Sequence, residues 1–413
     1  MANKKILLIA PYSYPVGGPE CIVNAKFTKL LTDIGYVVDL ISVKSKSTTY
    51  KLSSSEYYFS GVRYINVLES DNPPKIKRLI RQVIYSLKAS IYVGGFTGLT
   101  YGTIAILQTA EVLCKHNKYD YIITKVGGDK VGLYCSKRYK TRLIITFNDP
   151  WPRRRYPEPY GHGQKAEIPW YVNIMLGNIA KISYKILFPS ERLKDYVLSY
   201  LPDVARSKGI VFPHTVTSAL ISEYQHEPDL PGLTLIHTGS TGLWRDPQSL
   251  CEGLSLFLER HTNAKITIKF LGVEQFPASG RALKDYLNKY KISEHVEQIP
   301  PVSYEDSLEF VKHSDVCIIL EADLEEGIFM PTKITDYQQY SKPIWAISPQ
   351  EGVLNDLYRE NVIEYFSNVA SVESVRDTLE RIYSDYEQNK LRNYHSDRFY
   401  DVNVMKDVKK VLG

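Results

Sequence analysis

The sequence has 413 residues, of which 44% are hydrophobic and 23% charged, a composition typical of a folded globular protein that is too long for one ordinary core. Its net charge at pH 7 is only +5, and no dense lysine and arginine run is interleaved with aromatic residues, which disfavours a nucleic-acid-binding protein. The five cysteines form no CxxC pair, which favours a reducing compartment, and no apolar stretch reaches the roughly 18 residues that span a bilayer. We therefore expect a two-domain cytoplasmic protein, with peripheral contact at the inner face of the cell membrane left open.

The first half of the chain has the pattern of a Rossmann-like α/β unit. Ile6–Ala10 is an unbroken apolar run typical of a buried parallel strand, and a Pro/Gly loop separates it from helical spacing over Cys21–Leu31. Gly35 ends that helix before a strand at Val37–Ile41, which completes a strand–helix–strand unit. Further strands are predicted at Tyr121–Thr124, Leu143–Phe147 and Ile186–Phe188.

The same pattern begins again after residues 213–232, a stretch with three prolines that is typical of an interdomain linker. A strand at Leu233–His237, a glycine loop and a helix at Pro247–Glu259 follow. Further strands are predicted at Ile266–Leu271, Val316–Leu320 and Pro343–Ile347. The predicted fold class is therefore α/β, with two doubly wound Rossmann-like domains that face a cleft. The domains cover residues 1–212 and 213–387, and a helical tail from about residue 388 to 413 packs back on the first.

Glycine loops follow the first strand of each half. Gly17 and Gly18 stand directly before a helix, where backbone N–H groups can bind an anion, although a plain tight turn has the same pattern. Gly239 and Ser240 occupy the matching place in the second half, and Arg245 near the next helix start adds a guanidinium suited to a diphosphate. The structural alternative for that arginine is a surface ion pair with its neighbour, Asp246. Neither a GxGxxG at the first loop nor a GxxxxGK[ST] is present, which disfavours a dehydrogenase and a P-loop NTPase.

A third loop, residues 327–337, ends in a predicted helix start. Pro331 and Thr332 suit the first turn of a helix, and Lys333 then lies near its positive end. A cation is unfavourable there unless an anion occupies the site. Asp336 is three residues further on, so it faces the same side and can accept hydrogen bonds from ribose hydroxyls.

These loops together resemble a known family, the retaining GT-B glycosyltransferases of family 4, over essentially the whole chain. The resemblance implies transfer of a sugar from a nucleoside-diphosphate sugar, with residues 1–212 binding the acceptor and residues 213–387 the donor. It assigns Arg245 and Lys333 to the donor diphosphate, Asp336 to the ribose, and Gly17 and Gly18 to the junction of donor phosphate and acceptor. The segments that carry it are KILLIAPYSYPVGGPE, ITFNDPWP, ILFPSERLKDYV, VFPHTV, IHTGSTGLWRDP and GIFMPTKITDYQQYSKPIWAIS.

The acceptor side follows from the same resemblance. The ITFNDPWP segment implies a loop that faces the acceptor, so Asn148, Asp149 and Trp151 are acceptor-side candidates, with His162 in a nearby glycine loop. Asp149 could orient the acceptor hydroxyl, and the alternative is a loop acid without a chemical role. For His162 the alternative is an ordinary exposed loop histidine.

The expected chemistry needs no metal and no cofactor beyond the sugar nucleotide. The leaving diphosphate develops charge, which Arg245, Lys333 and the two helix starts can stabilise, and Asp149 completes the expected catalytic set. The sequence has no Asp-x-Asp, and residues 323–325 have the composition of a solvated loop. The family often has a glutamate where Ile328 stands, which predicts an apolar wall at the donor sugar, and a basic residue where Leu250 stands.

The expected partners are a nucleotide-sugar donor and a polysaccharide, oligosaccharide or lipid-linked acceptor in bacterial surface-glycan synthesis. A GT-B sugar epimerase or phosphorylase and a non-catalytic nucleotide-sugar-binding subunit of a glycan assembly complex remain open. Residues 74–92 place five basic side chains among apolar ones at helical spacing, the pattern of a helix at an anionic membrane surface. A surface helix packed on its own domain is the alternative. Arg153–Arg155 beside Trp151 is a second basic and aromatic spot.

Overall fold

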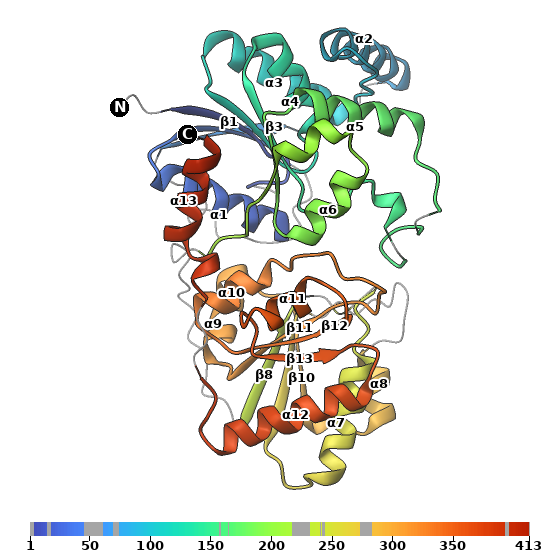
Figure 1. Ribbon diagram of the computed structural model, residues 1–413, viewed down its shortest axis with the longest axis vertical. Helices are drawn as coiled ribbons and strands as arrows, with labels where there is room; N and C mark the ends of the chain where they lie inside the picture. Colours follow the sequence, from blue (N-terminus) through green and yellow to red (C-terminus); the bar gives the residue numbers. More distant parts are fainter. Residues whose placement is uncertain are drawn as a thin grey trace. The chain divides into compact units, whose positions relative to one another are not determined.

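The computed structural model divides the chain into two units (Figure 1). The first contains Met1–Tyr156, Gly163–Thr215 and Tyr400–Gly413, and the second contains Pro157–His162 and Val216–Phe399. Residues 157–162 therefore belong with the second unit, although the first unit precedes and follows them in the sequence. The structure describes residues 4–14, 18–44, 61–68, 74–156, 158–163, 165–216, 232–239, 241, 244–272, 283–392 and 396–412.

The first unit is built on a parallel sheet, which among the described residues has seven strands in the order β3-β2-β1-β4-β5-β6-β7. The order runs one way from β1 to β3 and the other way from β4 to β7, so its direction reverses between β1 and β4. The central strands are mostly apolar and almost fully buried because helices cover both faces of the sheet. The strands are β1 (Lys5–Ile9), β2 (Val37–Lys44), β3 (Val62–Leu68), β4 (Tyr121–Thr124), β5 (Arg142–Thr146), β6 (Lys185–Phe188) and β7 (Gly209–Val211).

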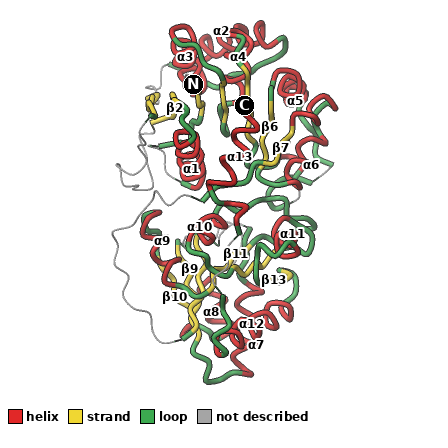
Figure 2. Tube along the Cα trace, turned by 60° about the vertical axis from the view of Figure 1, so that its left-hand side comes forward, coloured by secondary structure: helices red, strands yellow, loops and turns green. Residues whose placement is uncertain are grey.

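Helices form layers on the two faces of this sheet. α3 and α4 lie on one face with α2 outside them, and α1 and α13 pack together on the other (Figures 1 and 2). Val404 and Val408 of α13 join Ile6 and Leu8 of β1 in one buried cluster. The helices are α1 (Pro19–Asp33), α2 (Lys75–Val93), α3 (Tyr101–His116), α4 (Asp129–Tyr139), α5 (Trp170–Ile182), α6 (Glu191–Ser199) and α13 (Asp401–Leu412), with short 3-10 helices η1 (Arg153–Arg155) and η2 (Asp203–Lys208).

The second unit repeats this design. Six parallel strands within its described part follow the order β10-β9-β8-β11-β12-β13, and the direction of the order reverses between β8 and β11. The strands are β8 (Leu233–Thr238), β9 (Ile266–Leu271), β10 (Val296–Ile299), β11 (Val316–Leu320), β12 (Ile344–Ser348) and β13 (Tyr365–Asn368).

The helices of the second unit start where the sequence supplies caps. Ser303 and Ser371 accept hydrogen bonds from backbone N–H groups three residues on, and so fix the starts of α9 and α12. α7 and α12 pack side by side, with Phe257 and Leu379 fully buried between helices and sheet. The helices are α7 (Gln248–Arg260), α8 (Leu283–Tyr290), α9 (Tyr304–His313), α10 (Lys333–Gln339), α11 (Val353–Arg359) and α12 (Val372–Glu387), with η3 (Ser293–His295) and η4 (Asp397–Phe399).

The predicted fold class is confirmed, because each unit is a doubly wound parallel α/β domain. Strands predicted at residues 121–124, 266–271 and 316–320 agree residue for residue, and the other predicted strands differ by one to three residues at their ends. The predicted linker at 213–232 lies mostly outside the described residues. Among the helices that are described, none is long and apolar enough to cross a membrane.

Candidate functional site

Two positively charged side chains meet at the strand reversal of the second unit. Gly239 directly follows β8 and has a φ of +99°, a conformation that side chains rarely adopt. A Cβ built on it would lie 3.5 Å from the Lys333 Nζ, so the ammonium group sits beside the backbone of this loop. The same Nζ donates a hydrogen bond to the carbonyl of Thr238, the last residue of β8. The turn after β8 and the start of α10 thus form one site, at the place where open α/β sheets bind ligands.

The environment of Lys333 disfavours its positive charge. The pKa of the ammonium group is lowered to about 7, mainly by burial and also by the nearby Arg245 guanidinium, while Glu321 and Asp336 act in the opposite direction. A bound anion would reverse the balance, because it would stabilise the charged form of both basic groups. The two neighbouring basic groups therefore favour an anionic ligand.

Arg245 forms its ion pair with Glu321, not with Asp246. The Arg245 Nε lies 3.3 Å from the Glu321 Oε1, and the Glu321 side chain, directly after β11, is only 7% exposed. Asp246 instead accepts hydrogen bonds from the Gln248 backbone N–H at the start of α7, at 3.0 Å, and from the Tyr286 hydroxyl, at 2.9 Å. The surface pair considered for Arg245 is therefore wrong, and the guanidinium lies in the same cluster as Lys333.

Aromatic side chains surround this cluster. The Tyr160 ring makes edge contacts with Trp244 and Phe329, with ring centroids 5.1 and 4.8 Å away. Its hydroxyl donates a 3.4 Å hydrogen bond to Glu321 Oε2, and burial followed by the charge of Glu321 raises the pKa of that hydroxyl. Sequence reasoning missed both Tyr160 and Glu321. Glu321 could have been found, because it is an acid that directly follows a predicted buried strand.

The remaining predicted donor residues have varied surroundings. Asp336 accepts a 2.5 Å hydrogen bond from the Tyr304 hydroxyl of α9 and is close enough to Lys333 to affect its pKa. Pro331 is buried and Thr332 is the residue before α10, partly exposed. Ile328 is only 2% exposed, and its expected role as an apolar wall at the donor sugar stays a prediction. Two further predicted residues, Gly17 and Ser240, lie outside the described residues.

The first unit carries a second polar cluster at its own strand reversal. Asn148, two residues after β5, donates through its side-chain amide to both Glu20 carboxylate oxygens, at 3.2 and 3.1 Å. Glu20 lies in the first turn of α1, just after Gly18, whose φ is +113°. Burial raises the pKa of Glu20, and the charge of Lys125, directly after β4, opposes that shift. The ends of β1, β4 and β5 therefore contribute to one cluster, although the sequence suggested only its asparagine.

Buried charges in this cluster lie close to titration at neutral pH. Burial lowers the pKa of Lys125 to about 8 and raises that of Asp129 to about 7. Thr124 donates a 2.9 Å hydrogen bond to Asp129, which stabilises its charged form. Asp149, beside the cluster, is exposed as a residue, yet the protein around its carboxylate raises its pKa, and Arg153 opposes the shift. Such groups are frequent where a protein binds a polar ligand or moves a proton.

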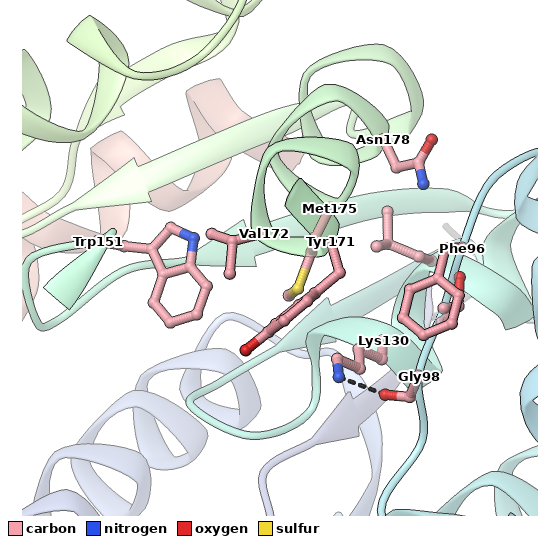
Figure 3. A pocket seen from close by; sticks show the side chains of 10 residues that line it. Phe96, Gly98, Lys130, Trp151, Tyr171, Val172, Met175 and Asn178 are labelled. Carbon is pink, nitrogen blue, oxygen red and sulfur yellow. Dashed lines mark hydrogen bonds between the residues drawn. The ribbon is translucent and has the colours of Figure 1, made fainter. Parts of the chain in front are cut away.

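An apolar pocket of about 440 Å³, including the space at its mouth, lies next to this cluster in the first unit (Figure 3). The Trp151 indole nitrogen points toward Val172, and Met175 and Tyr171 lie near the middle of the pocket. Lys130 lies on its wall and donates a hydrogen bond to the carbonyl of Gly98. The pocket is lined by Phe96, Thr97, Gly98, Lys130, Leu133, Trp151, Tyr171, Val172, Met175 and Asn178.

His162 is part of neither the polar cluster around Lys333 nor the one around Glu20. Its side chain is exposed, and it belongs with the second unit, two residues after Tyr160. Its suggested acceptor role therefore stays a prediction.

Comparisons with known proteins identify the fold of the chain. Family models and curated proteins gave no match to the sequence. Among solved structures, HepE from Anabaena in complex with UDP and glucose is similar over 99% of both chains, with 12% identity and a TM-score of 0.65. Sucrose-phosphate synthase from Thermosynechococcus elongatus is similar over 99% of this chain and 98% of its own, with 13% identity and a TM-score of 0.65. The chain has the GT-B fold.

The GT-B fold extends beyond transferases. A protein from Listeria monocytogenes named as a UDP-N-acetylglucosamine 2-epimerase is similar over 99% of this chain and 95% of its own, with 10% identity and a TM-score of 0.57. Identities this low establish a fold and leave the reaction to be argued from the site. In this GT-B chain, both polar clusters lie at the strand reversals of their sheets.

Proposed function

We propose that the protein is a glycosyltransferase that moves a sugar from a nucleoside-diphosphate sugar to a glycan or lipid-linked acceptor in bacterial surface-glycan synthesis. The observation that carries the proposal is that Lys333, beside the backbone of Gly239 at the strand reversal of the second unit, lies near the guanidinium of Arg245. Two cations around a tight glycine turn suit a diphosphate better than a single phosphate or a neutral ligand. The structurally similar HepE, which is known in complex with UDP and glucose and with UDP-glucose, supports the choice of ligand.

The second unit supplies the donor chemistry in this proposal. Lys333 and Arg245 bind the diphosphate and stabilise the charge that develops as it leaves, so they lower the barrier to bond cleavage. Glu321 holds the Arg245 guanidinium in place, since the two form an ion pair. Asp336 binds the ribose hydroxyls, next to its contact with Tyr304.

The first unit supplies the acceptor chemistry. Asp149 orients the attacking hydroxyl, and Asn148, fixed by its hydrogen bonds to Glu20, holds the loop that carries it. Following the resemblance to family 4, we propose that the configuration of the sugar is retained and that the leaving diphosphate accepts the proton of the acceptor. Trp151 lines the apolar pocket beside this loop, which suits the non-sugar part of an acceptor.

A thermal-shift screen with UDP-, GDP- and TDP-sugars tests the donor class. A ligand that binds only the folded state raises its stability, by about 2.7 kcal/mol at a concentration of one hundred times Kd. We expect one nucleotide series to raise the melting temperature and the free sugars to leave it unchanged. Failure of all three series, with a folded sample, would contradict the proposal.

Activity should survive chelation of divalent metals. The positive charge that a metal would supply at the diphosphate is already provided by Lys333 and Arg245. We expect donor turnover in 5–10 mM EDTA (roughly the usual excess for removing hard cations) to equal turnover without it. Loss of turnover that added magnesium or manganese restores would show that the two side chains are not sufficient.

Donor affinity should fall as the pH rises above neutral. The pKa of Lys333 is about 7, and a bound diphosphate raises it, so binding takes up a proton between those two pH values. Donor affinity is therefore maximal below pH 7, and above pH 7 it weakens by up to about tenfold per pH unit. Titration calorimetry with UDP-glucose from pH 6 to 9 measures this, since its esterified diphosphate does not itself titrate in that range.

The matched control for this prediction is Lys333→Arg, which stays charged throughout the range and should remove the slope. A slope that is unchanged in this variant would assign the titration to another group.

An epimerase is the second candidate, because one similar structure is named as such. The two reactions differ in their products: an epimerase returns a nucleotide sugar, whereas a transferase releases the nucleoside diphosphate and forms a new glycosidic bond. A non-catalytic binding subunit would do neither.

A further inference from the structure

Helix α2 shows its apolar side to the outside of the molecule. A surface helix normally turns its apolar stripe toward the core. In α2 only Ala89 and Val93 are buried. Among the strongly exposed large apolar side chains of the described residues, half belong to this helix: Ile76, Leu79, Ile80, Val83, Ile84, Leu87, Ile91 and Tyr92.

The exposed apolar side chains form one continuous face. At 100° per residue, positions 76, 79, 80, 83, 84, 87 and 91 fall within about 140° of the helix circumference. Their exposed fractions range from 50% at Val83 to 79% at Ile91. The helix lies at the outer edge of the first unit, beside α3 and α4 (Figure 1). The fold of the unit therefore leaves this face uncovered.

The charges of α2 have one sign. The helix contains five basic residues and no aspartate or glutamate. Lys88, which points toward the body, pairs with Glu111 of α3 at 2.8 Å. Lys75, Lys77, Arg78 and Arg81 have no carboxylate partner among the described residues, and the first, second and fourth of these are exposed. An uncovered apolar face bordered by unpaired cations is complementary to a surface that is apolar inside and anionic outside.

Aromatic residues extend the apolar face beyond the end of the helix. Phe96, three residues after α2, packs against Trp170 and Tyr171 at the start of α5, with centroid distances of 5.1 and 6.5 Å. Trp170 is 63% exposed, and its two partners Phe96 and Tyr171 also line the apolar pocket. Tryptophan and tyrosine are favoured at membrane interfaces because their rings are apolar and their tips polar.

We propose that α2 and the Phe96–Trp170–Tyr171 cluster dock the protein on an anionic lipid bilayer, with α2 lying in the interface plane. The apolar face enters the headgroup and acyl boundary, and the basic residues beside it bind anionic headgroups. The docked orientation brings the mouth of the apolar pocket to the bilayer surface, where the chain of a lipid-linked acceptor would be available. Docking requires no nucleotide, so the docking proposal can be tested, and can fail, independently of the proposed transfer reaction.

Vesicle flotation of the full chain tests the docking surface. Vesicles of phosphatidylcholine with about a third phosphatidylglycerol should carry the protein upward, and pure phosphatidylcholine vesicles should not. Ile84→Glu with Leu87→Glu should lower binding to the anionic vesicles roughly tenfold or more. Lys77→Glu with Arg81→Glu should lower it by at least about fivefold per charge. All four side chains point outward, so these variants should melt at the temperature of the parent.

Val204→Glu is the matched control, since Val204 is a 52% exposed apolar residue of η2, away from α2. It should bind anionic vesicles as the parent does. The exposed Trp170 gives a second readout: vesicles should shift the tryptophan emission to the blue, and Trp170→Phe should remove most of the shift.

Equal binding to both kinds of vesicle, no binding to either, or full binding by the Ile84 and Leu87 variant would overturn the proposal. A parent that is a dimer without vesicles and a monomer after those substitutions would assign the face to a second copy instead.

Discussion

Replacing Lys333 with alanine should weaken binding of the donor sugar nucleotide by roughly 10- to 150-fold, the loss expected for one hydrogen bond to a charged group. The Lys333 Nζ lies beside Gly239 at the reversal of the second sheet, so it is placed to contact a diphosphate there. Binding is best measured at pH 6.5, where the group with a pKa of about 7 is mostly charged. The matched control is Lys312→Ala, which removes a half-exposed lysine that pairs with Glu309 on α9.

Arg245→Ala should have an effect of similar size, with an added cost in stability. Removing the guanidinium leaves Glu321, 7% exposed, without its ion-pair partner, and an unpaired buried charge destabilises a fold. Arg245→Lys keeps a positive charge near Glu321 and loses the forked geometry, so it should fold and still bind the donor weakly. Arg260→Ala, which removes a surface pair with Glu380, is the control on the same unit. Donor binding as tight as in the parent for either site variant would show that its residue does not contact the diphosphate.

Asp149→Asn should lower turnover by roughly 10²- to 10⁴-fold, the usual range for a group that orients or accepts a proton. Donor affinity should stay unchanged, because Asp149 belongs to the first unit and the diphosphate groups to the second. Steady-state kinetics with saturating donor, together with a donor-binding isotherm, separate the two effects.

The control for the aspartate is Asp203→Asn in η2, a 90% exposed acid that pairs with Arg206. Glu20→Gln should have an intermediate effect, because the amide can still contact Asn148 but loses the charge that holds it. Parental turnover by Asp149→Asn would mean that this residue is an ordinary loop acid.

The sequence predicts the sheets of this protein well because their strands are buried on both faces. Runs such as residues 121–124 and 316–320 are fully buried, rich in apolar residues and bounded by polar or turn residues, so their limits are clear. Because the limits of the strands are clear, the loops that follow them could also be predicted. These loops contain Gly239, Lys333 and Asn148. Parallel strands place those loops at one edge, which is why residues far apart in sequence could be assigned to shared sites.

Other parts of the site depend on tertiary contacts that no local pattern records. Tyr160 lies in the first half of the sequence, yet its ring packs on Trp244 and Phe329 of the second unit. Ile328 was expected to form an apolar wall at the donor sugar, and no local pattern shows how deeply the structure buries it. Glu20 gains its role only through Asn148, more than a hundred residues away. The basic pattern of α2 predicted an amphipathic helix, and only the structure shows that its apolar face points outward.

Product analysis by mass spectrometry tests the central claim most directly. The protein would be incubated with the nucleotide sugar that stabilises it most and with an extract of bacterial lipid-linked and free glycans, beside its Lys333→Ala variant. We expect an acceptor that gains the mass of one sugar residue, release of one nucleoside diphosphate for each transfer, and far less of both with the variant. A donor that stays intact while bound, or one that is converted into an isomeric nucleotide sugar, would contradict the assignment as a glycosyltransferase.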